Sequence, residues 1–134
     1  MAHILVVEDN AANMKLASLL LRNAGHSVLP AVDAETALAM ARTERPDLIL
    51  MDVQLPDMDG LTATALLKQD PATASIPVIA VTAMAMTQDR QKTMDAGCDG
   101  YISKPLRYRE LYAAIDHLLG LPGAPTPSAT DVGG

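Results

Sequence analysis

The sequence predicts an α/β protein: an open, doubly wound sheet of five parallel strands with helices on both faces. Short runs of aliphatic and β-branched residues alternate with longer amphipathic runs, which is the pattern of repeated βα units. Several of the short runs are almost continuously apolar, as strands buried on both faces must be. The predicted strands cover residues 3 to 8, 27 to 32, 47 to 52, 76 to 81 and 99 to 103.

Three of the intervening helices begin or end at residues with clear signals. The first ends at Gly25, which suits a left-handed C-terminal turn. The second begins at the N-cap Asp33, and the third runs from Gly60 to Asp70-Pro71. Residues at helical spacing give the first, second and fifth helices an apolar stripe. These stripes are Met14, Ala17, Leu21 and Ala24; Ala37, Leu38 and Ala41; and Leu111, Ile115, Leu118 and Leu119.

The fourth helix and the C-terminal end of the chain differ from the rest. From Thr87 to Thr93 every residue is polar, so little apolar area can hold this helix to the sheet, and we expect it to move. Its apolar anchors stand only at its ends: Met84, Met86, Met94 and Ala96. Residues 120 to 134 are rich in Pro, Gly and small polar residues, which predicts a flexible tail after one folded domain of residues 1 to 119.

Composition excludes several classes of function. The chain has 134 residues and a net charge of -6, which argues against a protein that binds nucleic acid through its phosphates. The lone Cys98 excludes an internal disulfide and fits a reducing compartment. The N-terminus passes directly into the first predicted strand, without a charged leader or a long apolar stretch. We therefore expect a cytoplasmic protein with no membrane association.

Chemically active side chains stand where the predicted strands end. Glu8 and Asp9 follow the first strand, and Asp52 closes the third. Thr82 and Lys104 follow the fourth and fifth strands. Because an open parallel sheet gathers its functional groups outside the carboxyl ends of its strands, these side chains should meet at one edge. Other polar residues nearby have simpler roles: Asp57 and Asp59 are expected to form the turn before Gly60, and Asn10 to be a loop or cap residue.

Three carboxylates at one edge would repel one another, and a divalent cation removes that conflict. Mg²⁺ is the expected ion, because it takes oxygen ligands and keeps waters that a phosphoryl group can displace. The backbone carbonyl of Gln54 could supply a further ligand. Lys104 and Thr82 would bind phosphoryl oxygens while Asp52 attacks phosphorus to form an aspartyl phosphate. A cis Lys104-Pro105 bond would aim the lysine back toward the strand ends.

Five ordered segments carry a resemblance to a known family. They are Val6-Val7-Glu8-Asp9-Asn10, Leu48-Ile49-Leu50-Met51-Asp52-Val53-Gln54-Leu55-Pro56, Asp59-Gly60, Val81-Thr82-Ala83 and Tyr101-Ile102-Ser103-Lys104-Pro105. In order and spacing they resemble the receiver domain of two-component response regulators, from residue 3 to about 119, and most of all its small single-domain members. The resemblance implies a flavodoxin-like (βα)₅ fold with strand order 2-1-3-4-5.

The resemblance also implies roles for the residues of the site. Asp52 would be the phosphoacceptor, taking its phosphoryl group from a phosphohistidine of a sensor kinase or histidine phosphotransferase. Glu8 and Asp9 would hold Mg²⁺ together with Asp52 and the Gln54 carbonyl. Thr82 and Lys104 would bind the phosphoryl group, and Tyr101 would turn inward as the switch aromatic. Glu8 departs from the commonest family pattern, which has Asp there, and lengthens one ligand arm. Such a protein catalyses its own phosphorylation and dephosphorylation but is not a metabolic enzyme.

A partner surface is expected beside the site, on the fourth helix, fifth strand and fifth helix. Met84, Met86, Tyr108 and Tyr112 mark it, because Met and aromatic side chains are favoured at protein contacts. Three alternatives remain open. The chain could be a phosphotransfer intermediate or a receiver cut from a hybrid kinase or longer regulator, or an adaptor that no longer switches. A flavodoxin-like cofactor carrier is disfavoured, because carboxylates in the first βα turn would repel a cofactor phosphate.

Overall fold

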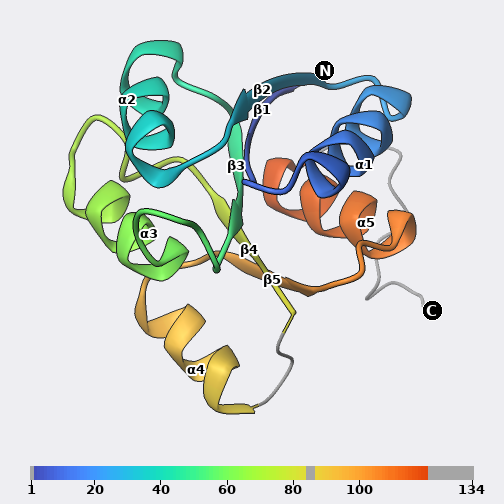
Figure 1. Ribbon diagram of the computed structural model, residues 1–134. Coiled ribbons are helices and arrows are strands. Elements are labelled where there is room, and N and C mark those ends of the chain that lie inside the picture. The colour runs from blue at the N-terminus through green and yellow to red at the C-terminus, as the bar shows by residue number, and fades with distance from the viewer. Residues whose placement is uncertain (1, 84–86, 121–134) are drawn as a thin grey trace.

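Five parallel strands alternate with five helices in the computed structural model, which describes residues 2–83 and 87–120 (Figure 1). The strands are β1 (His3–Val7), β2 (Ser27–Ala31), β3 (Leu48–Asp52), β4 (Val78–Thr82) and β5 (Gly100–Ser103). The helices are α1 (Ala11–Asn23), α2 (Ala34–Glu44), α3 (Gly60–Gln69), α4 (Thr87–Asp95) and α5 (Tyr108–Leu119). The order across the sheet is β2-β1-β3-β4-β5, which confirms the predicted topology.

Two apolar cores lie on opposite faces of the sheet. Helices α1 and α5 cover one face, where Leu21 and Ile115 are fully buried against the side chains of β1, β3 and β4. Helices α2 and α3 cover the other face, where Ala37 and Leu67 pack on the alternate residues of the same strands. Every residue of β3 and β4 is buried, as the continuous apolar runs predict.

The helices begin where the sequence signals stand. Asn10 caps α1 by accepting a hydrogen bond from the Asn13 amide at 3.0 Å, which confirms its expected role. Asp33 caps α2 through the Thr36 amide at 2.8 Å. Asp59 was expected to form a turn; its side chain is the N-cap of α3 and accepts from the Leu61 amide.

The predicted strand ends are correct to within two residues. A prediction that is wrong concerns α4. Met94, expected as an apolar anchor of that helix, is 66 % exposed, so this prediction is wrong. The buried side chain on the described part of α4 is instead that of Thr93. Met84, Met86 and all of the expected tail except Gly120, the C-cap of α5, lie outside the described residues. Among the residues that the structure describes, no helix is long and apolar enough to span a membrane.

Candidate functional site

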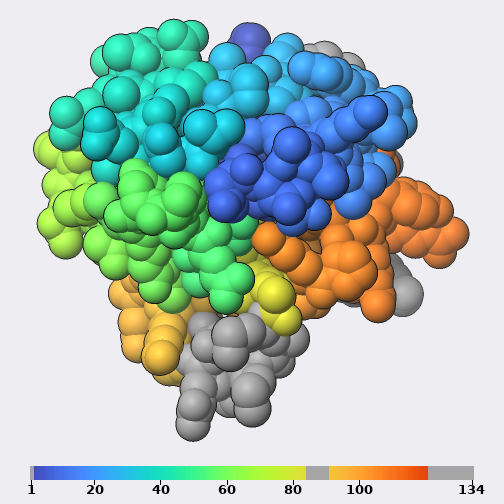
Figure 2. Space-filling model, viewed as in Figure 1, coloured from blue at the N-terminus to red at the C-terminus, as the bar shows by residue number. Residues whose placement is uncertain are grey.

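The predicted site residues meet at the carboxyl edge of the sheet. Val7 of β1 lies opposite Met51 of β3, so Glu8 and Asp52 follow at neighbouring positions. On the other side, the backbone amide of Lys104 donates to the carbonyl of Thr82 at 2.7 Å. In Figure 2 the blue, green, yellow and orange surfaces of the segments after β1, β3, β4 and β5 converge near the centre of the view. Four chain segments far apart in sequence therefore build one site.

Three carboxylates form a tight acidic cluster. One oxygen each from Glu8, Asp9 and Asp52 lies within 4.8 Å of the others. The Asp52 residue is 3 % exposed and Glu8 is 6 % exposed, whereas Asp9 lies open to solvent. All the donors are hard oxygens with solvent on one side, so the cluster fits a divalent cation that retains part of its water shell.

Lys104 balances part of this negative charge. Its Nζ lies 3.1 Å from Oδ2 of Asp52 and 3.4 Å from Oε1 of Glu8. Burial by itself would lower the pKa of this ammonium group, but the hydrogen bond and charge of Asp52, with a contribution from Glu8, outweigh burial and raise it. Lys104 is thus held as a cation directly beside Asp52. The Lys104-Pro105 peptide bond, whose isomer the sequence left open, is cis.

Glu8 carries the cost of crowding these charges. Burial raises the pKa of its carboxyl group, and the neighbouring Asp52 raises it further. The Asn10 amide, which donates to Oε2 of Glu8 at 3.1 Å, opposes this shift without cancelling it. A cation placed among these carboxylates would relieve the unfavourable charge.

The loop between β3 and α3 is closely fitted to Asp52. The Gln54 amide donates to Oδ1 of Asp52 at 3.0 Å, and the Gly60 amide donates to the carbonyl of Val53 at 2.8 Å. A Cβ atom at Gly60 would stand 2.1 Å from the carbonyl oxygen of Asp52, so no other residue fits there without moving the backbone. The two oxygens of Asp52 therefore face different partners, the Gln54 amide and the Lys104 ammonium.

The two expected switch residues lie on adjacent strands. Thr82 is the last residue of β4 and is buried, while Tyr101, in β5, is paired with Ala80 of β4 and is half-buried. Thr82 comes one position after Val81, the residue of β4 that is paired with Asp52.

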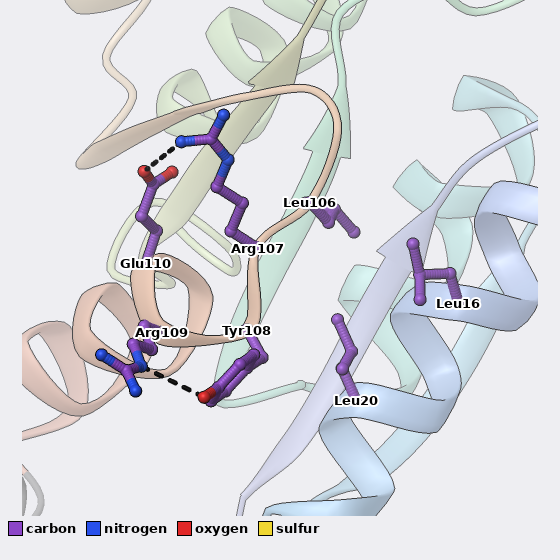
Figure 3. A pocket seen from close by; sticks show the side chains of 7 residues that line it. All are labelled: Leu16, Leu20, Leu106, Arg107, Tyr108, Arg109 and Glu110. Atoms are coloured by element: carbon purple, nitrogen blue, oxygen red, sulfur yellow. Dashed lines mark hydrogen bonds and ion pairs between the residues drawn. The ribbon is translucent and has the colours of Figure 1, made fainter.

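An apolar groove of about 610 Å³ opens between α1 and the start of α5 (Figure 3). Its lining consists of Leu16, Leu20, Leu106, Arg107, Tyr108, Arg109 and Glu110. Figure 3 shows Leu106, from the segment after β5, pointing toward the two leucines of α1. A smaller hollow, which Glu8 and Lys104 also line, shares Leu16 and Leu106 with this groove. The groove was not predicted; the sequence signal for it is the leucines of α1 outside its buried stripe.

Tyr108 and Tyr112, predicted to mark a partner surface together with α4, lie at the start of α5 beside α1. Their rings meet edge to face with centroids 5.9 Å apart. The Tyr112 hydroxyl donates to the carbonyl of Leu20 at 2.7 Å, and Tyr108, half of which is exposed, lines the groove. The first part of α5 is therefore hydrogen-bonded to α1 through Tyr112.

The fold and this edge define a class of protein. Comparison with known families matches residues 4–116 to the response regulator receiver domain. The chain belongs to this family and has the phosphoacceptor role of a response regulator. Receiver domains interact with histidine kinases or histidine phosphotransferases.

Within the family, the chain is similar to polar-differentiation response regulators. It is 44 % identical over 117 residues to the polar-differentiation response regulator DivK of Brucella anthropi, and the match covers 87 % of this chain and 95 % of that protein. The DivK protein of Brucella melitensis gives the same identity and coverage.

Solved structures agree with this assignment. The receiver domain of sensor histidine kinase PA1611 from Pseudomonas aeruginosa, with a magnesium ion coordinated in its active site cleft, has a TM-score of 0.83 and 35 % identity over 89 % of this chain and 98 % of its own. The chemotaxis protein CheY4 of Vibrio cholerae has a TM-score of 0.83 and 28 % identity over 89 % of this chain and 99 % of its own. The acidic cluster and its family are thus consistent with Mg²⁺.

Proposed function

We propose that Asp52 is the phosphoacceptor and that Glu8, Asp9, Asp52 and the Gln54 carbonyl hold a Mg²⁺ ion beside it. The observation that carries this assignment is the position of Asp52 between the acidic cluster and the Lys104 ammonium, 3.1 Å from its Oδ2. Bound Mg²⁺ would neutralise the oxygens of an incoming phosphoryl group and the charge of the cluster. Asp9, the exposed member of the cluster, remains open to an ion arriving from solvent.

The transfer itself needs position and charge rather than acid-base chemistry. A carboxylate oxygen of Asp52 forms a bond to phosphorus while the bond from phosphorus to the donor imidazole nitrogen breaks, and the electron pair stays on that nitrogen. Lys104 balances the charge on the phosphoryl oxygens, and the Thr82 hydroxyl donates to one of them. The buried position of Asp52 keeps its carboxylate poorly hydrated and ready to attack.

Phosphorylation would then change which proteins the domain binds. Thr82 moves toward the phosphoryl group, and Tyr101 on the adjacent strand turns inward, which biases the surface of α4, β5 and α5 toward a binding form. The two tyrosines that we assign to this surface, Tyr108 and Tyr112, sit where α5 meets α1. A downstream protein target on this face, with Met84 and Met86 at its edge, is the expected partner.

The phosphohistidine donor must approach from the open side of the cluster. The groove of Leu16, Leu20, Leu106 and Tyr108 adjoins the cluster there through the hollow that Glu8 and Lys104 share. Its apolar lining suits the surface of a helical donor protein that presents the phosphohistidine to Asp52.

Intact mass spectrometry after incubation with acetyl phosphate tests the assignment. Wild type should gain one phosphoryl group with Mg²⁺ and none with EDTA, and Asp52→Asn should gain none under either condition. Asp59→Asn is the matched control, because this carboxylate lies on the same loop but caps α3 outside the cluster. A phosphoryl group retained by Asp52→Asn, or a gain that does not need a divalent cation, would contradict the proposal.

A further inference from the structure

The carboxylate of Asp57 ties the loop after β3 to the start of α2. Its Oδ1 accepts a hydrogen bond from the Ala34 amide at 2.9 Å, and its Oδ2 accepts from the Glu35 amide at 3.0 Å. These are the first two residues of α2, whose amides have no acceptor within the helix. The sequence predicted Asp57 as a turn residue. Asp57 does lie in a bend, and its side chain in addition bonds amides that stand 23 and 22 residues earlier in the chain.

Two carboxylates, those of Asp33 and Asp57, therefore accept hydrogen bonds from the amino end of α2. Asp33 is the N-cap of α2 and accepts from the Thr36 amide, so it acts within its own segment. Asp57 takes the two preceding amides from a different segment, the loop that follows the phosphoacceptor. The amides of Ala34 and then Glu35 hold the pKa of the Asp57 carboxyl below its usual range, so both oxygens stay available as acceptors near neutral pH.

The loop that Asp57 holds is fixed to Asp52 at its other end. The Gln54 amide donates to Oδ1 of Asp52, and Gly60 packs against the Asp52 carbonyl with no room for a side chain. Asp57 lies in the loop between these two contacts, three positions after Gln54. A change in the attachment of Asp57 is therefore transmitted along three residues of loop to the peptide that contacts the acceptor carboxylate.

We propose that Asp57 is a positioning residue of the phosphoacceptor site, which by its hold on α2 keeps the Gln54 peptide in place beside Asp52. The Gln54 amide then stays directed at Asp52, and the Gln54 carbonyl stays available to the metal. The metal part rests on the proposed function, whereas the amide part concerns only contacts within the domain. Asp57 touches neither the phosphoryl group nor the ion and acts through Gln54.

Asp57→Ala and Asp33→Ala separate this role from simple capping of α2. Each variant removes one carboxylate from the same helix end, but only Asp57 belongs to the loop. Mg²⁺ binding by titration calorimetry should weaken about 10-fold in Asp57→Ala, as for other residues that orient a metal ligand, and stay within about twofold of wild type in Asp33→Ala. Hydrogen exchange of the Gln54 amide, measured by NMR without Mg²⁺, should accelerate only in Asp57→Ala.

Asp57→Asn adds a graded control, because its one carbonyl oxygen can still accept from Ala34 or Glu35. It should fall between wild type and Asp57→Ala in both measurements. Equal effects of Asp57→Ala and Asp33→Ala on Mg²⁺ binding and on Gln54 exchange would overturn the inference and leave Asp57 as a cap. If wild type binds no Mg²⁺, the proposed metal site fails, and the Gln54 exchange rates alone decide the inference: unchanged exchange in Asp57→Ala overturns it and accelerated exchange supports it.

Discussion

Polar groups are paired differently at the two ends of the strands, which we call the amino edge and the carboxyl edge of the sheet. At the amino edge they are matched: the His3 amide donates to Asp47, the Ala2 amide to Nδ1 of His26, and Lys68 donates to Asp99 and to the carbonyl of Ile76. At the carboxyl edge, three carboxylates lie together, and Lys104 forms ion pairs with two of them, Glu8 and Asp52. These polar groups of the amino edge have partners within the protein, whereas the carboxyl edge has more carboxylate oxygens than Lys104 can pair with.

This difference indicates which part of the domain a ligand can stabilise. Matched polar groups stabilise the fold and offer nothing to a ligand. Crowded carboxylates destabilise the free protein, so a cation or phosphoryl group that enters their site relieves a cost already present. Substitutions at the amino edge should therefore change stability alone, and those at the carboxyl edge should change stability and ligand response together.

The largest expected effect comes from the steric fit at the carboxyl edge. Gly60→Ala should lower the free energy of unfolding by about 3 kcal/mol, because its Cβ would stand 2.1 Å from the backbone oxygen of Asp52. Chemical denaturation measures this change. Gly120→Ala is the control: its φ is 63°, but no heavy atom lies within 4 Å of the added Cβ, so the cost should be only about 1 kcal/mol. Equal losses would mean that packing against Asp52 is unimportant.

At the amino edge, Lys68→Met should cost about 1–2 kcal/mol of unfolding free energy. The substitution leaves the carbonyl of Ile76 without this donor and the partly exposed Asp99 carboxylate without its ion pair. Urea denaturation gives the loss, and calorimetry should show unchanged Mg²⁺ binding. Lys15→Met, at an exposed position of α1, should leave both quantities unchanged. Weaker Mg²⁺ binding by Lys68→Met would contradict our expectation that substitutions at the amino edge change stability alone.

Removing a carboxylate from the crowded edge should have the opposite sign. In EDTA, Asp52→Asn should raise the free energy of unfolding by about 1 kcal/mol, because Glu8 loses a repelling neighbour while Lys104 keeps Glu8 as a partner. Mg²⁺ should stabilise wild type more than the variant and so reduce or reverse this difference in thermal unfolding. Glu44→Gln, at an exposed site on α2, controls for net charge. A destabilised Asp52→Asn in EDTA would show that the attraction between Asp52 and Lys104 outweighs the repulsion among the carboxylates.

A smaller effect should follow from the raised pKa of Glu8. Folding favours its protonated form, so its contribution to stability is fully present below the unfolded value of 4.5 and is lost as pH rises through the higher folded pKa. Glu8→Gln should remove this loss. Comparing urea unfolding of wild type and Glu8→Gln in EDTA across this range tests the sign; a difference that grows in favour of wild type as pH rises would contradict it.

His26, at the matched edge, should show the reverse dependence and the smallest effect. Burial lowers the pKa of its imidazole, partly opposed by Asp116, so folding favours the neutral form that accepts from the Ala2 amide. Its contribution to stability is present above the unfolded value of 6.5 and is lost as pH falls through the lower folded pKa. His26→Asn cannot titrate and should lack this loss in the same unfolding series. An identical slope below pH 6.5 in both proteins would exclude His26 as its source.

Much of the fold was predictable because its signals are local. Buried strands of a parallel sheet are recorded as apolar runs, and caps such as Asn10 and Asp33 stand within three residues of the amides they bind. The residues of the acidic cluster could be found because each follows an apolar run. Their convergence then follows from the parallel topology.

The features that were missed depend on contacts between distant segments. Nothing near Asp57 in sequence indicates that its partners are the amides of α2, and the turn residues around it favour a simpler interpretation. The groove combines leucines of α1 with Leu106, which only the folded chain brings together. Met94 was assigned as an apolar anchor of the fourth helix, but α4 turns that position to solvent.

The position of Lys104 near the end of the domain also affects when the site forms during folding. It pairs with Asp52 across 52 residues and with Glu8 across nearly the whole domain, so the last strand to leave the ribosome brings the counter-charge for carboxylates made long before. Contacts of such long range form late in folding, because the entropy of closing the chain must be overcome first. Asp52 therefore gains the ammonium group beside its carboxylate only when the final βα unit docks.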